Sequence, residues 1–345
     1  MTAPYQFVNN IISGRSFRWA VTGCAGFIGS HLIEALLSAD QEVLGIDSFV
    51  TGKERNLNIV KSLVGADKFS RFTFTKCDIR ETESLLQSFR GVDFVLHQAA
   101  LGSVPRSLKE PVLYHDNNVT GTASVFEACR LAGVKKVVFA SSSSVYGDNV
   151  ELPKVEERIG KALSPYALSK QMNEIDADLY ARVYGLNSVG LRYFNVFGPR
   201  QDPNGAYAAV IPRWISTLSR GESCEIYGDG STSRDFSPVP NIVQANLLSA
   251  LSGEPGFKVF NVGLGNSTSL ITLYDLIRKN VSSSSKVSKD VSRLDPKFLP
   301  ERKGDIKHSC ARITEITKLG YQEVVSLVQG IAWTVDAELS EITVS

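Results

Sequence analysis

Short hydrophobic runs alternate with longer segments of helical periodicity through the first two hundred residues. In the segment 27–38, Ile28, Leu32 and Leu36 recur four residues apart, as on one face of a helix. The short runs are almost continuously apolar, which is typical of parallel strands covered on both faces. The expected strands are 17–22, 43–47, 72–75, 93–97, 136–142 and 188–193. The pattern therefore predicts a doubly wound α/β fold with a parallel sheet.

The rhythm changes after residue 198, where prolines and glycines cluster. We expect helices around 208–220 and 270–281, a strand near 258–262 and an exposed Ser/Lys-rich loop over 282–292. The chain then divides into an N-terminal extension (1–17), a cofactor domain (18–198) and a smaller mixed α/β substrate lobe (199–345). One element of the lobe can return to the first sheet.

Charge and composition exclude several classes of protein. The 345 residues hold 37 Lys and Arg against 36 Asp and Glu, so no net field recruits nucleic acid or an anionic membrane. No run approaches the ~20 apolar residues of a membrane span, and the N-terminus lacks a secretion signal. The five cysteines and four histidines form no CxxC or HExxH pattern. We expect a cytoplasmic protein whose chemistry uses no metal.

A glycine-rich loop follows the first predicted strand. Gly23, Gly26 and Gly29 form a GxxGxxG, which permits a tight turn and lets backbone N–H groups approach a pyrophosphate at a helix N-terminus. Asp47 ends the second predicted strand, where a carboxylate accepts hydrogen bonds from the adenosine ribose and repels a 2′-phosphate. The loop therefore favours NAD over NADP. A purely structural strand–helix turn with a capping Asp is the alternative.

A second group of polar residues suggests proton chemistry. Tyr166 and Lys170 lie four residues apart on the predicted helix 166–184 and so share a face. A neighbouring ammonium stabilises phenolate over phenol, which makes a tyrosine a usable base. The serine run 141–144 ends the strand 136–142, at the sheet edge where such folds bind ligands. The alternatives are a solvated Tyr/Lys pair and a polar loop.

These motifs, together with four longer sequence segments, resemble the extended short-chain dehydrogenase/reductase family, whose cofactor domain has the Rossmann fold. Within it the chain is similar to the nucleotide-sugar 4-epimerases, and especially to the bacterial UDP-N-acetylglucosamine 4-epimerases. The four segments are HQAALGSVPRS at 97–107, LRYFNVFG at 191–198, DPNGAYAAVIP at 202–212 and GDGSTSRDF at 228–236. The resemblance extends from about Arg18 to the 304–305 region and weakens towards the C-terminus.

The resemblance implies a role for each matching position. Tyr166 would take the proton of the sugar 4-hydroxyl with the help of Ser142, while Lys170 would hold the nicotinamide ribose and tune Tyr166. NAD would contact Gly23, Gly26, Phe27, Ile28, Gly29, Asp47, Asp78, Ile79, Gln98, Ala99, Ala100, Asn118, Tyr166 and Lys170. The UDP-sugar would contact Gly102, Ser103, Ser142, Ser143, Ser144, Asn195, Ala209, Val210, Tyr227, Arg234, Arg302, Asp305 and Ser309.

The activity implied is NAD-dependent 4-epimerisation of UDP-N-acetylglucosamine to UDP-N-acetylgalactosamine, or of the corresponding uronates, through a 4-keto intermediate. Small residues at Ala209 and Ser309, at the family's size gate, would leave room for a 2-acetamido group. Arg106 is a candidate partner for a uronate. A homodimer is also implied, through a four-helix bundle of helices around 118–131 and 166–184.

Other functions on the same fold stay open. Sister 4,6-dehydratases carry an Asp-Glu pair just after the catalytic Ser or Thr, and decarboxylases often place Glu there; this chain has Ser143 and Ser144. A non-catalytic NAD(H)-binding regulator would not need Ser142, Tyr166 and Lys170 together. The chain departs from its relatives just before the predicted helix 242–250. Where they usually have a Cys-Tyr or similar pair it has Ser237 and Pro238, and a second proline, Pro240, follows two residues later.

Overall fold

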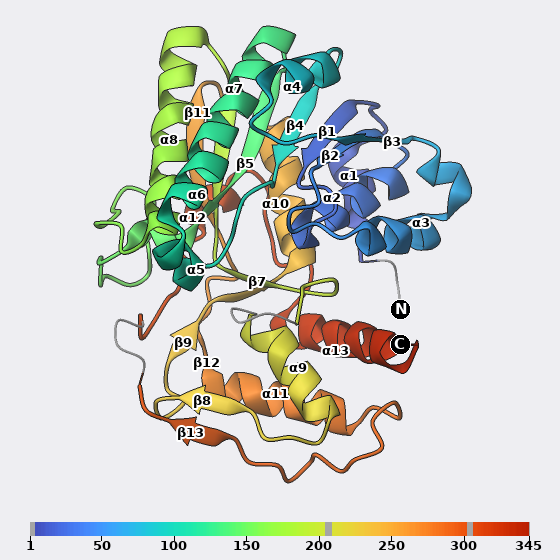
Figure 1. Ribbon diagram of the computed structural model, residues 1–345, viewed down its shortest axis with the longest axis vertical. Coiled ribbons are helices and arrows are strands. Elements are labelled where there is room, and N and C mark those ends of the chain that lie inside the picture. The colour runs from blue at the N-terminus through green and yellow to red at the C-terminus, as the bar shows by residue number, and fades with distance from the viewer. Residues whose placement is uncertain (1–3, 204–208, 302–305, 345) are drawn as a thin grey trace.

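The computed structural model describes residues 4–203, 209–301 and 306–344, with side chains as far as residue 341. Its centre is a seven-stranded parallel sheet with strands in the order β11-β6-β5-β4-β1-β2-β3 (Figure 1). The strands are β1 (Arg18–Thr22), β2 (Glu42–Asp47), β3 (Phe72–Lys76), β4 (Phe94–His97), β5 (Lys136–Ser142), β6 (Ser188–Tyr193) and β11 (Phe257–Val262). The doubly wound fold is confirmed, and each strand expected before residue 198 is present.

Helices cover both faces of this sheet (Figure 1). One face carries α2 (Phe27–Ser38), α3 (Glu54–Phe69) and α10 (Val239–Leu251), with the short α1 (Phe7–Ile12) packed on α10. The other carries α4 (Thr82–Phe89), α7 (Gly121–Ala132) and α8 (Pro165–Tyr184). The sequence indicated a one-sided apolar stripe on α2, but residues 29–37 are all buried, because α3 and α10 enclose the helix against the sheet.

Short elements connect the sheet to a second lobe, which lies below it in Figure 1. Next to the sheet are α5 (Val104–Lys109), α6 (Pro111–His115), a π-helical turn (Asp116–Thr120), a 3-10 turn (Ser143–Tyr146) and α12 (Thr314–Thr317). At the junction, β7 (Asn195–Phe197) pairs in parallel with β10 (Phe236–Pro238). The lobe contains α9 (Val210–Ser219), α11 (Leu270–Ser282), α13 (Leu327–Val344), β8 (Glu225–Tyr227), β9 (Ser233–Arg234), β12 (Thr268–Ser269) and β13 (Lys297–Leu299).

More of the C-terminal half returns to the sheet than the one element expected. Both α10 and β11 belong to the sheet layer, and β11 pairs with β6 along its whole length. The two prolines fit this arrangement, because Pro238 caps α10 and Pro240 lies in its first turn, where backbone N–H groups have no helical partner. The helix therefore starts at Val239 and not at residue 242. Among the described helices, none has the length and apolarity to cross a bilayer.

Candidate active site

The glycine loop borders a cavity of about 320 Å³ at the carboxyl ends of β1, β2 and β4. Gly23 has φ +68°, and a Cβ there would lie 2.7 Å from the Ala99 nitrogen, so glycine is needed. Gly26 caps α2 without a side-chain hydrogen bond, which leaves the helix N-terminus open to this space. Eleven of the residues expected to contact NAD line it, namely Gly23, Gly26, Phe27, Ile28, Gly29, Asp47, Asp78, Ile79, Gln98, Ala99 and Ala100.

Two carboxylates that line this cavity, those of Asp47 and Asp78, already make contacts with neighbouring residues. Asp47 accepts hydrogen bonds from the backbone nitrogens of Ala25 (2.9 Å) and Phe49 (2.8 Å), which ties β2 to the glycine loop. Its burial raises the pKa of the Asp47 carboxyl, and these N–H groups oppose the shift. Asp78 pairs with Arg80 at 2.7 Å, which lowers the pKa of Asp78.

Asn118, which was expected to contact NAD, lies behind the cofactor cavity. Its side chain does not line the cofactor cavity, which Asn117 borders instead. The Asn118 amide is buried, accepts from the Leu101 nitrogen (2.8 Å) and donates to Ser169 Oγ (3.1 Å). Within the π-helical turn this residue faces the strand-end loop and α8, so it braces the site from behind.

A second cavity, of about 470 Å³, adjoins the first and shares Phe27, Ile28, Gln98, Ala100 and Gly102 with it. It brings together the three residues expected to carry the proton chemistry. Ser142 ends β5, and its hydroxyl lies near enough to the Tyr166 phenol to lower the pKa of that group. The Lys170 nitrogen lies 6.0 Å from the centre of the Tyr166 ring. Gly102, Ser103, Ser143 and Asn195 also line this cavity, as the resemblance implied.

The protonation energetics differ from the sequence expectation. Burial raises the pKa of the Tyr166 phenol above its usual value, and the nearby Ser142 hydroxyl lowers it only in part. Lys170 does not offset this burial, since its ammonium turns to the Ala140 carbonyl oxygen at 2.7 Å. Burial also lowers the pKa of Lys170 to about 8, while the nearby Glu174 carboxylate raises it. In the chain by itself, Tyr166 is therefore a protonated phenol at neutral pH.

A third cavity, of about 230 Å³, continues into the second lobe. Asn195, Val196 and Gln201 border both it and the second cavity, so the three spaces form a row. Its lining includes four residues expected to contact the substrate, namely Ala209, Val210, Tyr227 and Arg234. Gln201 lines both cavities but was not expected from the sequence. Its position directly before the segment 202–212, which resembles the family, could have indicated it.

Several expected substrate residues lie elsewhere. Ser144, in the 3-10 turn, does not line the second cavity; its hydroxyl oxygen is buried, and its backbone nitrogen donates to Ser142 Oγ. Ser309 lies beside β9, with its nitrogen donating to the Ser233 carbonyl at 3.1 Å, and is outside the lining of the second and third cavities. Arg302 and Asp305 fall outside the described residues.

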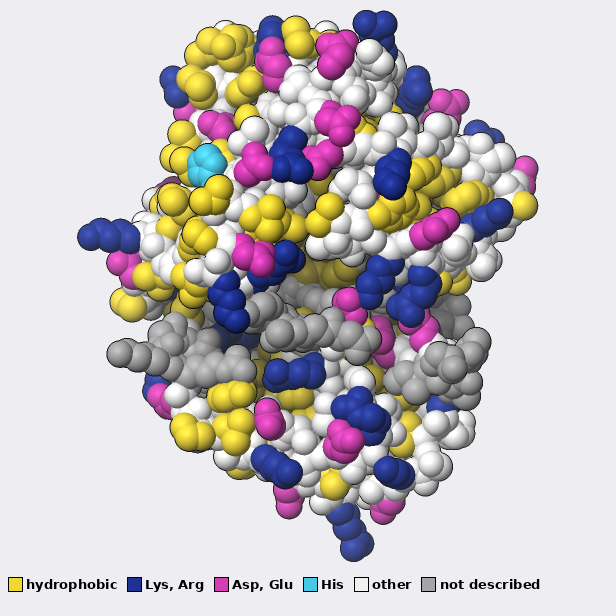
Figure 2. All heavy atoms as spheres, in the orientation of Figure 1, with side chains coloured by type: hydrophobic (Ala, Val, Ile, Leu, Met, Phe, Trp, Pro, Cys, Tyr) yellow, Lys and Arg dark blue, Asp and Glu magenta, His cyan; other side chains and the backbone are white. Residues whose placement is uncertain are grey.

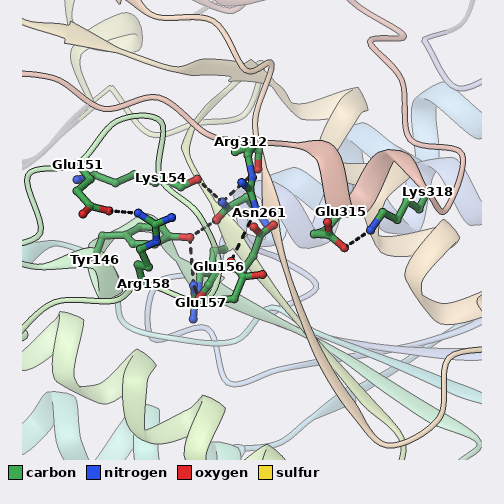
Figure 3. A network of polar contacts seen from close by, with 11 residues as sticks. Tyr146, Glu151, Lys154, Glu156, Glu157, Arg158, Asn261, Arg312, Glu315 and Lys318 are labelled. Atoms are coloured by element: carbon green, nitrogen blue, oxygen red, sulfur yellow. Dashed lines mark hydrogen bonds and ion pairs between the residues drawn. The ribbon is translucent and has the colours of Figure 1, made fainter.

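A polar network holds the segment that leads into α8. Asn261 of β11 donates from its amide to the backbone oxygens of Lys154 (2.8 Å) and Arg312 (3.2 Å) (Figure 3). Tyr146 donates to the Asn261 side-chain oxygen at 2.6 Å (Figure 3). These contacts bind the loop before α8 to the sheet and so support the position of Tyr166 at the start of that helix.

Known proteins share this architecture and sequence. Residues 19–263 match the NAD dependent epimerase/dehydratase family. A UDP-glucose 4-epimerase of Mycolicibacterium smegmatis is 37% identical over 323 residues, which cover 92% of this chain and 97% of that protein. The match to the family and the relative together extend over both lobes.

Two solved structures are also similar to the chain. A UDP-N-acetylglucosamine 4-epimerase from Methanobrevibacter ruminantium M1, in complex with UDP-N-acetylmuramic acid, is 40% identical with a TM-score of 0.86, over 95% of this chain and 99% of that one. A UDP-glucose 4-epimerase from Thermus thermophilus, in complex with NAD, is 33% identical with a TM-score of 0.79, over 93% and 98%. The chain therefore belongs to the NAD dependent epimerase/dehydratase family.

Proposed function

We propose that the protein interconverts UDP-N-acetylglucosamine and UDP-N-acetylgalactosamine by inverting carbon 4 of the sugar. It is an NAD-dependent epimerase of UDP-sugars, and the acetamido sugar is the substrate proposed here. The observation that carries the proposal is the meeting of Ser142, Tyr166 and Lys170 in the cavity that joins the glycine loop to the second lobe. The 40% identity with an N-acetylglucosamine epimerase supports the choice of sugar.

The cavity beside the glycine loop fits NAD. The N-terminus of α2 has no capping side chain, so its N–H groups and dipole are available to a pyrophosphate. Asp47 lies on the same lining, where it favours ribose hydroxyls and disfavours a 2′-phosphate. When bound, NAD supplies a positively charged ring that accepts a hydride from carbon 4 and returns it. The chain itself must therefore manage the proton and the orientation of the sugar.

Tyr166 and Ser142 are the proposed proton-transfer groups. In this proposal Tyr166 takes the proton of the 4-hydroxyl, directly or through the Ser142 hydroxyl, and returns it after the sugar has turned. Burial keeps the phenol protonated in the chain alone, so positive charge near the ring is needed to lower the pKa of Tyr166 and make it a base. Lys170, whose nitrogen lies 6.0 Å from the ring centre, would supply such a charge by turning from the Ala140 carbonyl towards the phenol.

The two sides of the substrate site suit different parts of a UDP-sugar. Tyr227 and Arg234 line the third cavity, where an aromatic ring can hold uracil and a guanidinium can pair with a diphosphate. One part of the second cavity is lined by Gly102, Ser103 and Ser143, whose small size gives a hexose room to turn in this proposal. Firm binding of the nucleotide with loose binding of the sugar is what hydride return to the opposite face requires.

Group elimination is disfavoured by the same residues. A dehydratase needs carboxyl groups beside the catalytic serine, and here Ser143 occupies the cavity wall while Ser144 is turned into the protein. For a uronate, Arg106 was the candidate partner, but it pairs with Glu110 at 2.8 Å. Epimerisation of a neutral sugar agrees best with these contacts.

The decisive experiment is a panel of UDP-sugars followed by analysis of the product sugar. Purified protein with bound nicotinamide should interconvert UDP-N-acetylglucosamine and UDP-N-acetylgalactosamine without added oxidant, faster than UDP-glucose or the uronates. The Tyr166→Phe variant is the control for contaminating activity. Bound cofactor with no turnover of any sugar would favour a regulator, and loss of water from the product would favour a dehydratase.

We also propose that the protein is a homodimer through α7 and α8. Apolar residues recur along α8 and stay exposed, and they include Leu168 (47% exposed), Ile175 (67%), Leu179 (42%) and Val183 (57%). Neighbouring α5 and α6 add Leu108 and Val112, and Figure 2 shows hydrophobic side chains gathered over this part of the surface. An exposed apolar stripe of this kind is typical of a helix-bundle interface.

A further inference from the structure

The N-terminal arm, residues 4–17, makes a buried polar contact near its first residues, and the proposed chemistry does not use this contact. Tyr5 is only 4% exposed, and its hydroxyl donates to His31 Nδ1 of α2 at 2.5 Å. Val8 and Ile12, on α1, are buried in the core shared with α10. The arm is therefore packed into the protein, with its phenol directed at one buried imidazole.

His31 connects this arm to the segment that follows β7. Its Nε2 lies 2.9 Å from the Pro199 carbonyl oxygen, and its Nδ1 also contacts Nη2 of Arg200. Burial holds the pKa of His31 well below its usual value, so the ring is neutral. A neutral ring with hydrogen on Nε2 suits these partners, since Nε2 then donates to Pro199 and Nδ1 is left as the acceptor that Tyr5 and Arg200 share.

The segment 199–202 needs such support because of its backbone. Arg200 has φ +67°, a left-handed conformation that residues with side chains seldom adopt unless their surroundings hold them. Its guanidinium donates to Glu34 Oε2 at 2.6 Å, and its backbone N–H acts to lower the pKa of the nearby Glu338 carboxyl. Two residues further on, Asp202 pairs with Lys53 at 2.6 Å.

This segment carries part of the wall between two cavities of the active site. Asn195, shortly before it, and Gln201, within it, both line the second and the third cavities. A shift of Arg200 would displace Gln201, the next residue along the chain. The arm is thus joined to the substrate site indirectly, through His31 and Arg200. It does not need to contact that site itself.

We propose that Tyr5 and His31 are positioning residues of the nucleotide-sugar site, and that they set its affinity by holding Pro199 and Arg200 in place. The inference rests on the proposed function, because it takes the second and third cavities to be the place where a UDP-sugar binds. It gives the N-terminal arm a role in substrate binding and not only in packing.

The test compares Tyr5→Phe, His31→Leu and His31→Gln in the full-length protein. Loss of one buried hydrogen bond should weaken UDP binding, measured by titration calorimetry, by about twofold to tenfold in Tyr5→Phe. His31→Leu removes every polar contact of the ring and should weaken it more, while His31→Gln, which keeps a donor and an acceptor, should recover part of the affinity. The KM for the sugar nucleotide should rise in parallel, with kcat nearly unchanged.

Val8→Ala is the matched control, because it loosens the packing of the arm without touching the polar contacts. It should lower the melting temperature and leave UDP affinity unchanged. The inference is overturned if Tyr5→Phe and His31→Leu bind UDP as the wild type does, or if all variants including Val8→Ala lose affinity in proportion to stability. Failure of the wild-type protein to bind UDP would overturn the proposed function as well.

Discussion

Glu174 and Arg192 form a buried ion pair directly behind the proposed catalytic residues. Arg192 Nη2 lies 2.7 Å from Glu174 Oε2, and Nε lies 2.9 Å from Oε1, so the pair is bidentate. The same carboxylate accepts from Ser141 Oγ at 2.5 Å, next to Ser142, and raises the pKa of Lys170. One buried charge therefore bears on both the serine run and the lysine.

Replacing Glu174 with Gln should change the pH dependence of turnover. Without the carboxylate, the pKa of Lys170 should fall further below about 8, and the ammonium would lose its proton at lower pH. The alkaline limb of the kcat profile should then move to lower pH. Opening a buried pair also costs about 3–5 kcal/mol of stability, so melting temperatures must accompany the kinetics. Glu127→Gln is the control, because Glu127 pairs with Arg130 at a half-exposed site, and it should leave the pH profile of kcat unchanged. An unmoved alkaline limb in Glu174→Gln would contradict the influence of Glu174 on Lys170.

Tyr166→Phe should abolish turnover and leave UDP-sugar binding nearly intact. The variant keeps the ring but loses the proposed proton-transfer group, an effect of about 10²–10⁴-fold on rate. Tyr184→Phe is a suitable control, since Tyr184 lies at the exposed end of the same helix. Parallel kinetics and titration calorimetry would separate rate from affinity. Retention of most of the rate by Tyr166→Phe would end its assignment as the base.

A bulky residue at position 309 tests the size gate that the family resemblance implies. A gate at this position predicts that Ser309→Tyr suppresses turnover of UDP-N-acetylglucosamine more than that of UDP-glucose. Ser309→Ala should keep both activities. Since Ser309 lies beside β9 and outside the cavity linings, equal loss on the two sugars would reject the gate and assign the effect to β9.

A charge on the exposed face of α8 tests the proposed dimer. Ile175→Glu should convert the protein to a monomer, because burying a carboxylate in an apolar helix interface is strongly unfavourable. Val150→Glu carries the same change on a loop residue that is 90% exposed, and it should remain dimeric. Light scattering coupled to size-exclusion chromatography distinguishes the two states. A wild-type protein that elutes as a monomer would exclude the interface.

Glu338 should make stability fall as pH rises towards neutrality. Burial, with Glu341 as the next cause, raises the pKa of Glu338 from 4.5 to about 7 in the folded chain. For a carboxyl whose pKa is raised on folding, its stabilising contribution is complete below the unfolded value and is lost as pH increases through the folded one. Glu338→Gln should therefore match the wild type near pH 5 and melt at a higher temperature above pH 7. Equal melting temperatures at both pH values would contradict the shifted pKa.

The sequence by itself predicted the strands of the sheet before residue 198, the glycine loop and the meeting of the proposed proton-transfer residues. The hydrophobic periodicity of strands and helices can be recognised within each short segment. A GxxGxxG motif directly after a strand is compatible with few conformations of the following turn. The carboxyl ends of parallel strands meet at one edge, so the order of strands along the chain already predicts that Ser142 and the glycine loop lie together. These features depend on neighbours a few residues apart.

Only the tertiary structure decided which buried groups face one another. Tyr5 meets His31 across 26 residues, and Arg200 meets it across 169, at distances in the chain that no local pattern records. The raised pKa of Tyr166 and the inward turn of Asn118 likewise follow from packing on every side. Burial and hydrogen bonding are sums over contacts from many segments, so they exist only once the chain has folded.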